Sequence, residues 1–197
     1  MKKKILFLVA IKEEVDLSFL DKHENVDYLY TGIGKVNSAI ALMDYLLRVN
    51  KQDFHVINIG TCGSSIYSIG DIFSVSECCE YGSNFISKKI KLKDISTKVP
   101  FCRYKDFILS SDFFISSQSL SSKEFHKFSK VYHNFDMEVA AEAKVCEYYD
   151  IPFSAFKIVS DDLKSSITDW EGILKELSPK VERIVKIIIE NYNKKNT

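Results

Sequence analysis

Acidic residues stand at several places in the chain where they could bind a ligand. Glu14 belongs to the stretch "AIKEEV", Asp136 and Glu138 flank a methionine in "FDMEVAAEA", and Asp161 follows "FKIVS". The small helix-forming residues after Glu138 are typical of the start of a buried helix, and a buried carboxylate needs a partner. Acids gathered in one place would suit a neutral, hydroxyl-rich ligand, because carboxylate oxygens accept hydrogen bonds from hydroxyl groups. Each acid taken alone has a structural alternative as a helix cap or a first-turn charge.

Strand-like and helix-like segments alternate along the chain that must position these acids. Strands are expected at 4–11, 26–31, 54–60, 71–77, 107–111, 131–137 and 153–160. Helices are expected at 34–50, 121–129, 138–149 and 169–192. The alternation predicts an α/β fold, with one sheet covered by helices on both faces and a single domain over residues 1–197.

Some segments carry more specific signals. Apolar residues at helical spacing in 34–50 form one stripe, which comprises Ile40, Met43, Leu46 and Leu47. "SSKEFHKFS" at 121–129 is typical of a capped helix. Pro179 allows a break in the last helix, because proline lacks the backbone N–H that a helix interior uses. The irregular stretch 80–106 is expected to hold loops or extra strands.

The segments that follow the expected strands carry most of the residues suited to chemistry. They read "KEE" at 12–14, "GIGK" at 32–35, "TCGSS" at 61–65, "DFFIS" at 112–116, "DME" at 136–138 and "SDD" at 160–162. Open α/β sheets bind ligands at the carboxyl ends of their strands, so we expect these segments to meet at one edge. The glycine segments also fit plain tight turns, since neither completes a phosphate-loop or dinucleotide motif. Phe113 and Phe114 likewise fit a core.

Composition excludes several classes of protein. The chain has 27 basic and 27 acidic residues, so its net charge of zero gives no general attraction to nucleic acid or to a membrane surface. "MKKKILFLVAI" starts like a signal peptide but lacks a cleavage site, and a first buried strand fits better. The five cysteines are expected to be reduced thiols in a cytoplasmic protein. Cys78 and Cys79 have no second ligand pair at zinc spacing, so no metal site is expected.

Six motifs, taken in order, resemble the purine and uridine phosphorylase superfamily, and within it the 5′-methylthioadenosine/S-adenosylhomocysteine nucleosidases. They are "AIKEEV" (10–15), "TGIGKVNSAIAL" (31–42), "VINIGTCGSSIYSIGDIFSVSE" (56–77), "SSDFFIS" (110–116), "FDMEVAAEAKVCEYYDIPF" (135–153) and "IVSDD" (158–162). The resemblance covers most of the chain. It implies a three-layer αβα sandwich with a central mixed sheet, as in nucleoside phosphorylases.

The resemblance implies hydrolysis of the N-glycosidic bond of a purine nucleoside, most closely of a 5′-substituted adenosine, without a cofactor or metal. Asp161 matches the general acid that protonates the purine N7, and Ser160 would help to hold it. Glu14 matches the base that activates the attacking water. Glu138 matches the acceptor of the ribose 2′- and 3′-hydroxyls, while Asp136 is expected to be a structural carboxylate.

Further residues match the family's substrate-binding positions. Met137 would pack against the sugar, Phe114 would stack on the base, and the backbone around Ile115 would read the purine edge. The full implied set is Ile11, Ile33, Thr61, Cys62, Gly63, Phe114, Ile115, Met137, Glu138, Ser160 and Trp170. The resemblance also implies a homodimer, in which the neighbouring subunit helps to form the pocket for the 5′ substituent.

Departures from the family pattern keep other functions open. Residues 16–30 form a shorter segment than in the family, and 78–106 matches poorly, which leaves the 5′ substituent undefined. The alternatives are a nucleoside phosphorylase, a futalosine-type hydrolase, and a nucleoside-binding protein whose catalysis has decayed. A phosphorylase needs cations for phosphate, whereas "IKEE" supplies negative charge and Arg48, Arg103 and Arg183 lie outside the matched motifs. Hydrolysis is therefore favoured.

Overall fold

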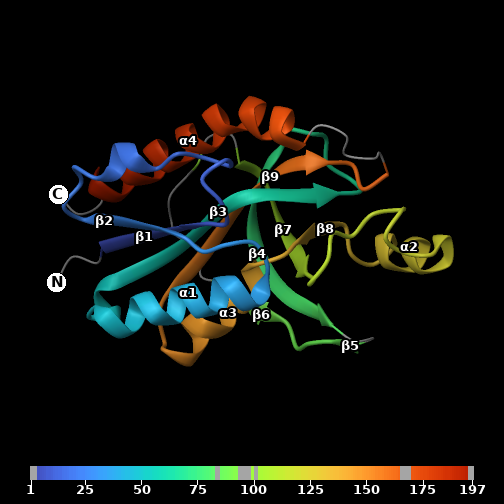
Figure 1. Ribbon diagram of the computed structural model, residues 1–197, viewed down its shortest axis with the longest axis horizontal. Helices are drawn as coiled ribbons and strands as arrows, with labels where there is room; N and C mark the ends of the chain where they lie inside the picture. The colour runs from blue at the N-terminus through green and yellow to red at the C-terminus, as the bar shows by residue number, and fades with distance from the viewer. Residues whose placement is uncertain (1–3, 83–84, 93–98, 100–101, 165–169, 195–197) are drawn as a thin grey trace.

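The computed structural model describes residues 4–82, 85–92, 99, 102–164 and 170–194 (Figure 1). Its strands are β1 (Lys4–Val9), β2 (Val26–Tyr30), β3 (Phe54–Ser64), β4 (Ile72–Gly82), β5 (Phe85–Ile86), β6 (Ile90–Lys91), β7 (Cys102–Ser110), β8 (Asn134–Asp136) and β9 (Phe153–Asp161). Its α-helices are α1 (Lys35–Arg48), α2 (Ser122–Ser129), α3 (Val139–Tyr148) and α4 (Trp170–Lys194). Short 3₁₀ turns occupy Ser18–Leu20 and Lys51–Asp53.

The described strands join one mixed sheet. β1 pairs in parallel with both β2 and β3, and β3 pairs in parallel with β9 over most of its length. β4 and β7 are parallel to each other, but β4 runs antiparallel to β9. The short β8 is parallel to β7 and antiparallel to the end of β3. The central mixed sheet implied by the resemblance is confirmed.

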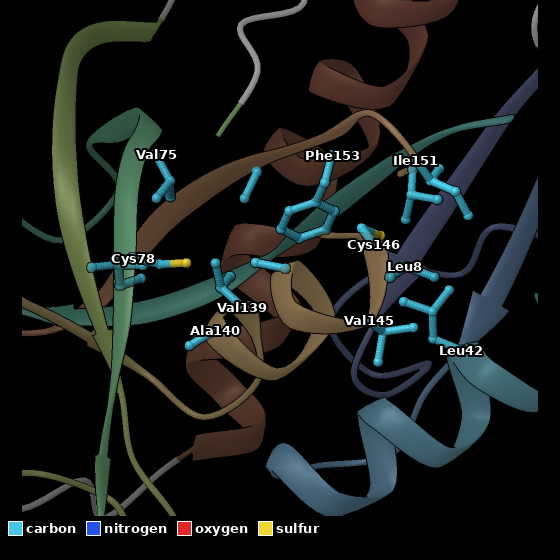
Figure 2. Close-up of a cluster of buried hydrophobic side chains, with 14 of the residues drawn as sticks. Leu8, Leu42, Val75, Cys78, Val139, Ala140, Val145, Cys146, Ile151 and Phe153 are labelled. Carbon is cyan, nitrogen blue, oxygen red and sulfur yellow. The ribbon is translucent and has the colours of Figure 1, made fainter. Parts of the chain in front are cut away.

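Helices cover both faces of this sheet (Figure 1). Side chains alternate between the two faces of a strand, so Ile5, Phe7 and Val9 of β1 face the core under α4. Leu6 and Leu8 face the opposite core, under α1 and α3 (Figure 2). These two helices lie side by side on their face of the sheet. The expected αβα sandwich is therefore confirmed.

The apolar stripe predicted for helix 34–50 is only partly buried, because Leu46 packs into the core and its other three residues do not. Ile40, Met43 and Leu47 are exposed, whereas Leu42 and Leu46 pack into the core beneath α1. The helix presents apolar residues on two sides, and periodicity alone does not say which side meets the sheet. The exposed side is left without a partner within the described part of this chain.

The break that Pro179 would allow does not occur, because α4 runs without interruption through that residue. Its apolar residues continue on both sides of the proline and pack against the sheet, including Leu177 and Val181. Tertiary packing of one long face thus outweighs the local cost of a proline in a helix.

The remaining expectations hold with changed boundaries. Ser121 and Glu124 form the capping box that begins α2. The strand expected at 131–137 shortens to the three residues of β8. Within 80–106, β4 extends to Gly82, β5 and β6 are added as short strands, and β7 begins at Cys102. The other parts of that stretch, at 83–84, 93–98 and 100–101, lie outside the described residues.

Candidate functional site

A cavity of about 450 Å³ opens at the carboxyl ends of the central strands, which is within the usual size of a small-molecule site. Its walls are formed by Ala10, Ile11, Glu14, Ile33, Thr61, Cys62, Gly63, Phe114, Ser116, Gln118, Phe135, Met137, Glu138, Ser160, Asp161 and Trp170. Every residue predicted for the site lines this cavity except Ile115. The expectation that the segments after the strands meet at one edge is confirmed.

Ile115 lies behind the cavity wall rather than on it. Its side chain is buried in a core cluster with Cys79, Leu109, Phe135 and Leu163. A role for the backbone around Ile115 in reading a purine stays a prediction. Four lining residues were not predicted from the sequence, namely Ala10, Ser116, Gln118 and Phe135. Ala10, Ser116 and Phe135 lie within the quoted motifs and Gln118 lies two residues after one, so closeness to a motif was the available signal.

Glu14 offers one oxygen to the cavity. Its Oε1 accepts hydrogen bonds from the backbone N–H of Thr61 at 2.8 Å and from Thr61 Oγ1 at 2.7 Å. Gly60 permits this approach, since a Cβ there would lie 3.1 Å from Oε1. Glu14 Oε2 is buried and has no hydrogen-bond partner among the described residues. Such an oxygen is suited to a hydrogen bond from a bound water or hydroxyl group.

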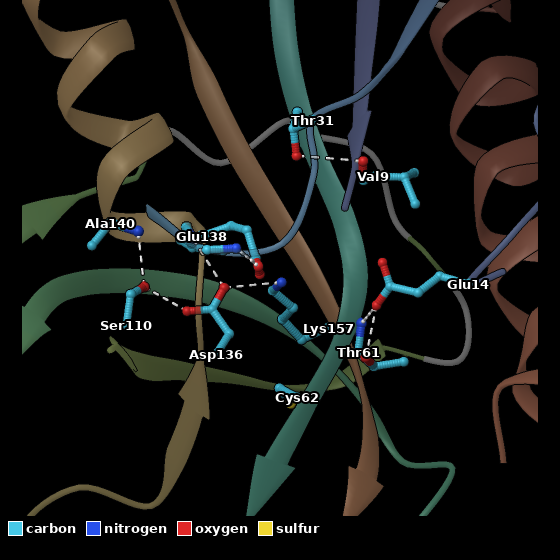
Figure 3. Close-up of polar contacts among 12 residues, drawn as sticks. Val9, Glu14, Thr31, Thr61, Cys62, Ser110, Asp136, Glu138, Ala140 and Lys157 are labelled. Atoms are coloured by element: carbon cyan, nitrogen blue, oxygen red, sulfur yellow. Dashed lines mark hydrogen bonds and ion pairs between the residues drawn. The ribbon is translucent and has the colours of Figure 1, made fainter. Parts of the chain in front are cut away.

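Asp136 joins several elements beneath the cavity (Figure 3). Its Oδ1 accepts a hydrogen bond from Ser110 Oγ at 2.5 Å, and its Oδ2 accepts one from the backbone N–H of Val139 at 3.0 Å. The same Oδ2 lies 3.0 Å from the ammonium of Lys157, and both side chains are buried. Protein groups thus occupy both oxygens, which fits the structural role expected for this acid.

Sequence reasoning did not identify Lys157 as a residue of the site. It is the one basic residue of β9 and lies in the middle of an otherwise apolar run, and that isolation was the available signal. Burial opposes its charge, but Asp136 and the three nearby glutamates outweigh this effect and hold the pKa of Lys157 above its ordinary value. Its ammonium is therefore a permanent positive charge under the cavity floor.

Glu138 connects the starts of two helices. It is the N-cap residue of α3, and its Oε1 accepts a hydrogen bond of 2.8 Å from the backbone N–H of Gly34, the N-cap residue of α1. Gly34 has a φ of +95°, a conformation that favours glycine. Burial, reinforced by the charge of Asp136, raises the pKa of Glu138 to about 7. Glu138 therefore ionises less readily than an ordinary glutamate, whereas hydrogen bonds donated to its carboxylate, such as that from Gly34, favour the ionised form.

Asp161 lies at the end of β9 in a close-packed corner. It accepts hydrogen bonds of 3.1 Å from Ser160 Oγ and from the backbone N–H of Leu163. A Cβ at Gly63 would lie 2.7 Å from Asp161 Oδ1 and 2.2 Å from Leu163, so only glycine fits there. Burial raises the pKa of Asp161 although both hydrogen bonds lower it. The carboxyl group is thus held in place while its proton is retained more strongly than in water.

Aromatic side chains form another part of the wall. The rings of Phe114 and Trp170 meet edge to face with centroids 6.4 Å apart, and both residues line the cavity. Met137 contributes a flexible apolar side chain between Asp136 and Glu138. A flat ring system would find apolar surface here, while the acids face the more polar part of a ligand.

Comparison with known proteins agrees with this geometry. The family model described as the phosphorylase superfamily matches residues 91–190, just over half of the chain. This chain belongs to the phosphorylase superfamily. A 5′-methylthioadenosine/S-adenosylhomocysteine nucleosidase of Buchnera aphidicola subsp. Acyrthosiphon pisum (strain APS) is 28% identical over 219 aligned positions, which cover 97% of this chain and 92% of the relative.

Solved structures share the fold of this superfamily member. A putative nucleosidase of the same name from Borrelia burgdorferi B31, bound to adenine, has a TM-score of 0.73 and 24% identity, covering 94% of this chain and 99% of its own. The futalosine hydrolase of Helicobacter pylori strain 26695 has a TM-score of 0.80 and 17% identity, covering 96% and 98%. At these sequence identities the similarity establishes the fold only, and the substrate must be inferred from the residues of the site.

Two further properties bear on the classes of protein considered above. Within the described residues, histidine, cysteine, aspartate and glutamate side chains form no group that could hold a metal ion. None of the described helices is long and apolar enough to cross a membrane.

Glu142 is a second buried acid that the sequence did not point to. It lies one turn after Glu138 on α3 and is fully buried. Among the described residues, neither of its carboxyl oxygens has a partner within normal hydrogen-bond geometry, and the same holds for Asn58 Oδ1, although the Asn58 side chain lies near enough to lower the pKa of Glu142 slightly. Burial raises the pKa of Glu142 to about 8, although Lys157 opposes this. A buried carboxyl group in this position is more stable protonated than ionised.

Glu142 should make the stability of this protein fall as pH rises. Its pKa is about 8 in the folded state against 4.5 for an ordinary glutamate, so folding binds a proton between these values. Its contribution is complete below pH 4.5 and is lost as pH rises towards 8. We expect Glu142→Gln, which stays neutral, to flatten this decline by at least about 2 kcal/mol of unfolding free energy. Urea unfolding measured from pH 5 to pH 9 tests this.

The control is Glu147→Gln, which removes an exposed acid from the same helix. It should leave the pH dependence of stability as it is in the natural protein. Equal pH profiles for Glu142→Gln and the natural protein would contradict the protonated state of Glu142.

Proposed function

We propose that this protein hydrolyses the N-glycosidic bond of 5′-substituted adenosines such as 5′-methylthioadenosine or S-adenosylhomocysteine, and releases adenine. The observation that carries the proposal is the meeting of Glu14, Glu138 and Asp161 around one cavity with different surroundings. The names of the superfamily relatives reported above support this choice of substrate class. One domain over residues 1–197 would contain the whole site.

Asp161 acts in this proposal as the general acid. An adenine leaves more easily when a ring nitrogen is protonated, and the acid that does this must hold a proton near neutral pH. The raised pKa of Asp161 supports the role, as do the hydrogen bonds that fix its carboxyl group. Phe114 and Trp170 would contact the base that accepts the proton.

Glu14 and Glu138 act in this proposal on the sugar and the water. The free Oε2 of Glu14 would orient and deprotonate a water that attacks the anomeric carbon. Glu138 would accept hydrogen bonds from the two ribose hydroxyls, for which two carboxylate oxygens are suited. Both carboxylates also favour the positive charge that develops on the ribose as the bond breaks.

Water is favoured over phosphate as the nucleophile. Phosphorolysis would require a phosphate dianion to lie against the ribose, next to Glu14 and Glu138. The described lining residues include neither lysine nor arginine, and the ammonium of Lys157 is already paired with Asp136. A second anion in this place would meet repulsion without a compensating cation.

Replacement of the general acid tests the proposal directly. We expect Asp161→Asn to lower the rate of adenine release from 5′-methylthioadenosine by about 10²–10⁴-fold, because the amide keeps the shape but has no acidic proton. Adenine can be measured by chromatography, with and without added phosphate, and the sugar product should be free sugar in both cases. The neighbouring Asp162→Asn should stay within a few-fold of the natural rate.

Two results would overturn the assignment. Formation of a ribose 1-phosphate when phosphate is present would favour a phosphorylase. A thermal shift with nucleoside but no adenine release by the natural protein would favour a binding protein. A panel of methylthio-, homocysteinyl-, deoxy- and futalosine-type substrates would then identify the 5′ substituent.

We also propose a homodimer in which α1 packs against α1 of a second copy. Ile33, Val36, Ile40, Met43 and Leu47 are exposed at intervals of three or four residues, which forms one apolar stripe. Ile33 also lines the cavity, so a partner on this stripe would help to close the pocket. In a dimer with two-fold symmetry both subunits use the same surface, so the stripe on one α1 would pack against the same stripe on the other.

Charge placed on the stripe should break this dimer. We expect the natural protein at micromolar concentration to show twice its chain mass of 22.6 kDa by light scattering. The double variant Ile40→Glu, Leu47→Glu should show the mass of one chain, since it would bury four carboxylates at the interface. Val131→Glu, an exposed apolar site outside α1, should remain dimeric. A natural protein with the mass of one chain would contradict the proposal.

The proposed reaction would take place in the cytoplasm, as a step of methionine salvage. The buried thiols of Cys62, Cys78, Cys79 and Cys146 suit a reducing compartment. Burial raises the pKa of each of these thiols, which keeps them protonated and unreactive.

A further inference from the structure

Lys35 is a buried lysine that the proposed reaction does not use. It is the first residue of α1, where the positive end of the helix dipole disfavours a cation. It is nevertheless 9% exposed, which is unusual for a lysine without a strong set of partners. The burial of this charge must therefore be compensated by nearby acceptors.

The partners of Lys35 come from strand β4 and from the loop that follows β7. Its ammonium lies 3.0 Å from Asp112 Oδ2 and 3.5 Å from Glu80 Oε1, and it donates a hydrogen bond of 3.0 Å to the carbonyl of Tyr81. Glu80 also pairs with Lys144 of α3, so its charge is shared between two cations. Asp112, in contrast, forms an ion pair with Lys35 and with no other cation among the described residues.

Asp112 begins the loop that carries Phe114 to the cavity wall. In the same loop, Ser111 Oγ donates a hydrogen bond to the carbonyl of Phe113, and the ring of Phe113 meets Tyr81 edge to face at 6.0 Å. The loop is thus attached to the end of β4 at the place where Lys35 lies. Movement of Asp112 would move Phe114, which is only two residues away.

The backbone next to Lys35 holds the other wall of the cavity. Gly34 donates its N–H to Glu138, so the same turn of chain fixes the acid proposed to bind ribose. We propose that Lys35 is a positioning residue, which ties the Phe114 loop to the first turn of α1 and so sets the distance between the base wall and the ribose acid. This proposal rests on the proposed function only where its test measures the rate of adenine release.

Because Asp112 is exposed, the positioning role of Lys35 can be tested without unfolding the protein. The Asp112 side chain is 59% exposed, so its ion pair adds little to the free energy of folding. A loss of Asp112 should therefore disturb the loop without unfolding the protein. Lys144, which is 46% exposed and pairs with the same Glu80, provides a matched control that does not contact the loop.

The first experiment compares lysine variants by adenine release from 5′-methylthioadenosine. We expect Lys35→Met to lower kcat/KM about tenfold, mainly through a higher KM, because the base and ribose contacts lose their spacing. Lys35→Arg keeps the charge and should recover to within threefold of the natural value. Lys144→Met should stay within twofold.

The second variant protects the test against failure of Lys35→Met to fold. Asp112→Ala should raise KM at least threefold with an unchanged melting temperature. Effects below twofold for both Lys35→Met and Asp112→Ala would overturn the proposal, as would an equal loss in Lys144→Met. If Lys35→Met does not fold, Asp112→Ala alone decides.

The third measurement is independent of catalysis. Trp170 is the one tryptophan in the sequence, and its ring contacts Phe114. A displaced loop should expose Trp170, so we expect acrylamide to quench its fluorescence at least twofold more efficiently in Lys35→Met than in Lys144→Met. Equal quenching in these two variants would overturn the positioning role. If the natural protein released no adenine, the proposed function would fail while this measurement would still test Lys35.

Discussion

The ion pair between Lys157 and Asp136 is the interaction on which the site depends. Asp136 accepts hydrogen bonds from Ser110 at the end of β7 and from Val139 in the first turn of α3, and it binds Lys157 of β9. One carboxylate therefore fixes the relative positions of two strands and a helix. Removing either charge would leave the other buried and unpaired, which typically costs about 3–5 kcal/mol. The geometry of Glu138, two residues after Asp136, follows from this anchor.

The same ion pair sets the protonation of the acids around it. One ammonium satisfies one carboxylate, so the other acids near Lys157 must bind a proton, a hydrogen-bond donor or a ligand with positive character. Glu142 is neutral in this balance, and Glu138 relies on the backbone N–H of Gly34. A nucleoside whose ribose becomes positively charged during bond cleavage would relieve the excess of negative charge. A phosphate ion would increase it.

Residues placed by backbone rules could be predicted from the sequence, whereas residues placed by packing could not. Glu14 and Asp161 follow apolar strands, and the sheet rule brings such positions to one edge whatever the details of packing. Lys157 and Glu142 were missed because a charged residue in a pattern is normally assigned to solvent. The buried face of α1 was only partly predicted because Ile40 and Leu42 are equally apolar, and only tertiary contacts select between them.

The balance at Asp161 explains why the corner around it is so closely packed. Hydrogen bonds from Ser160 and from the N–H of Leu163 favour the ionised carboxylate, while burial favours the protonated acid. A general acid needs both effects, since a group that is too acidic holds no proton and one that is too weak does not release it. Leu163 adopts a φ of 63°, an uncommon value for leucine, and in this conformation its N–H points to Asp161. The backbone conformation of Leu163 and the absence of a side chain at Gly63 thus allow the carboxyl group of Asp161 to be buried and hydrogen-bonded at the same time.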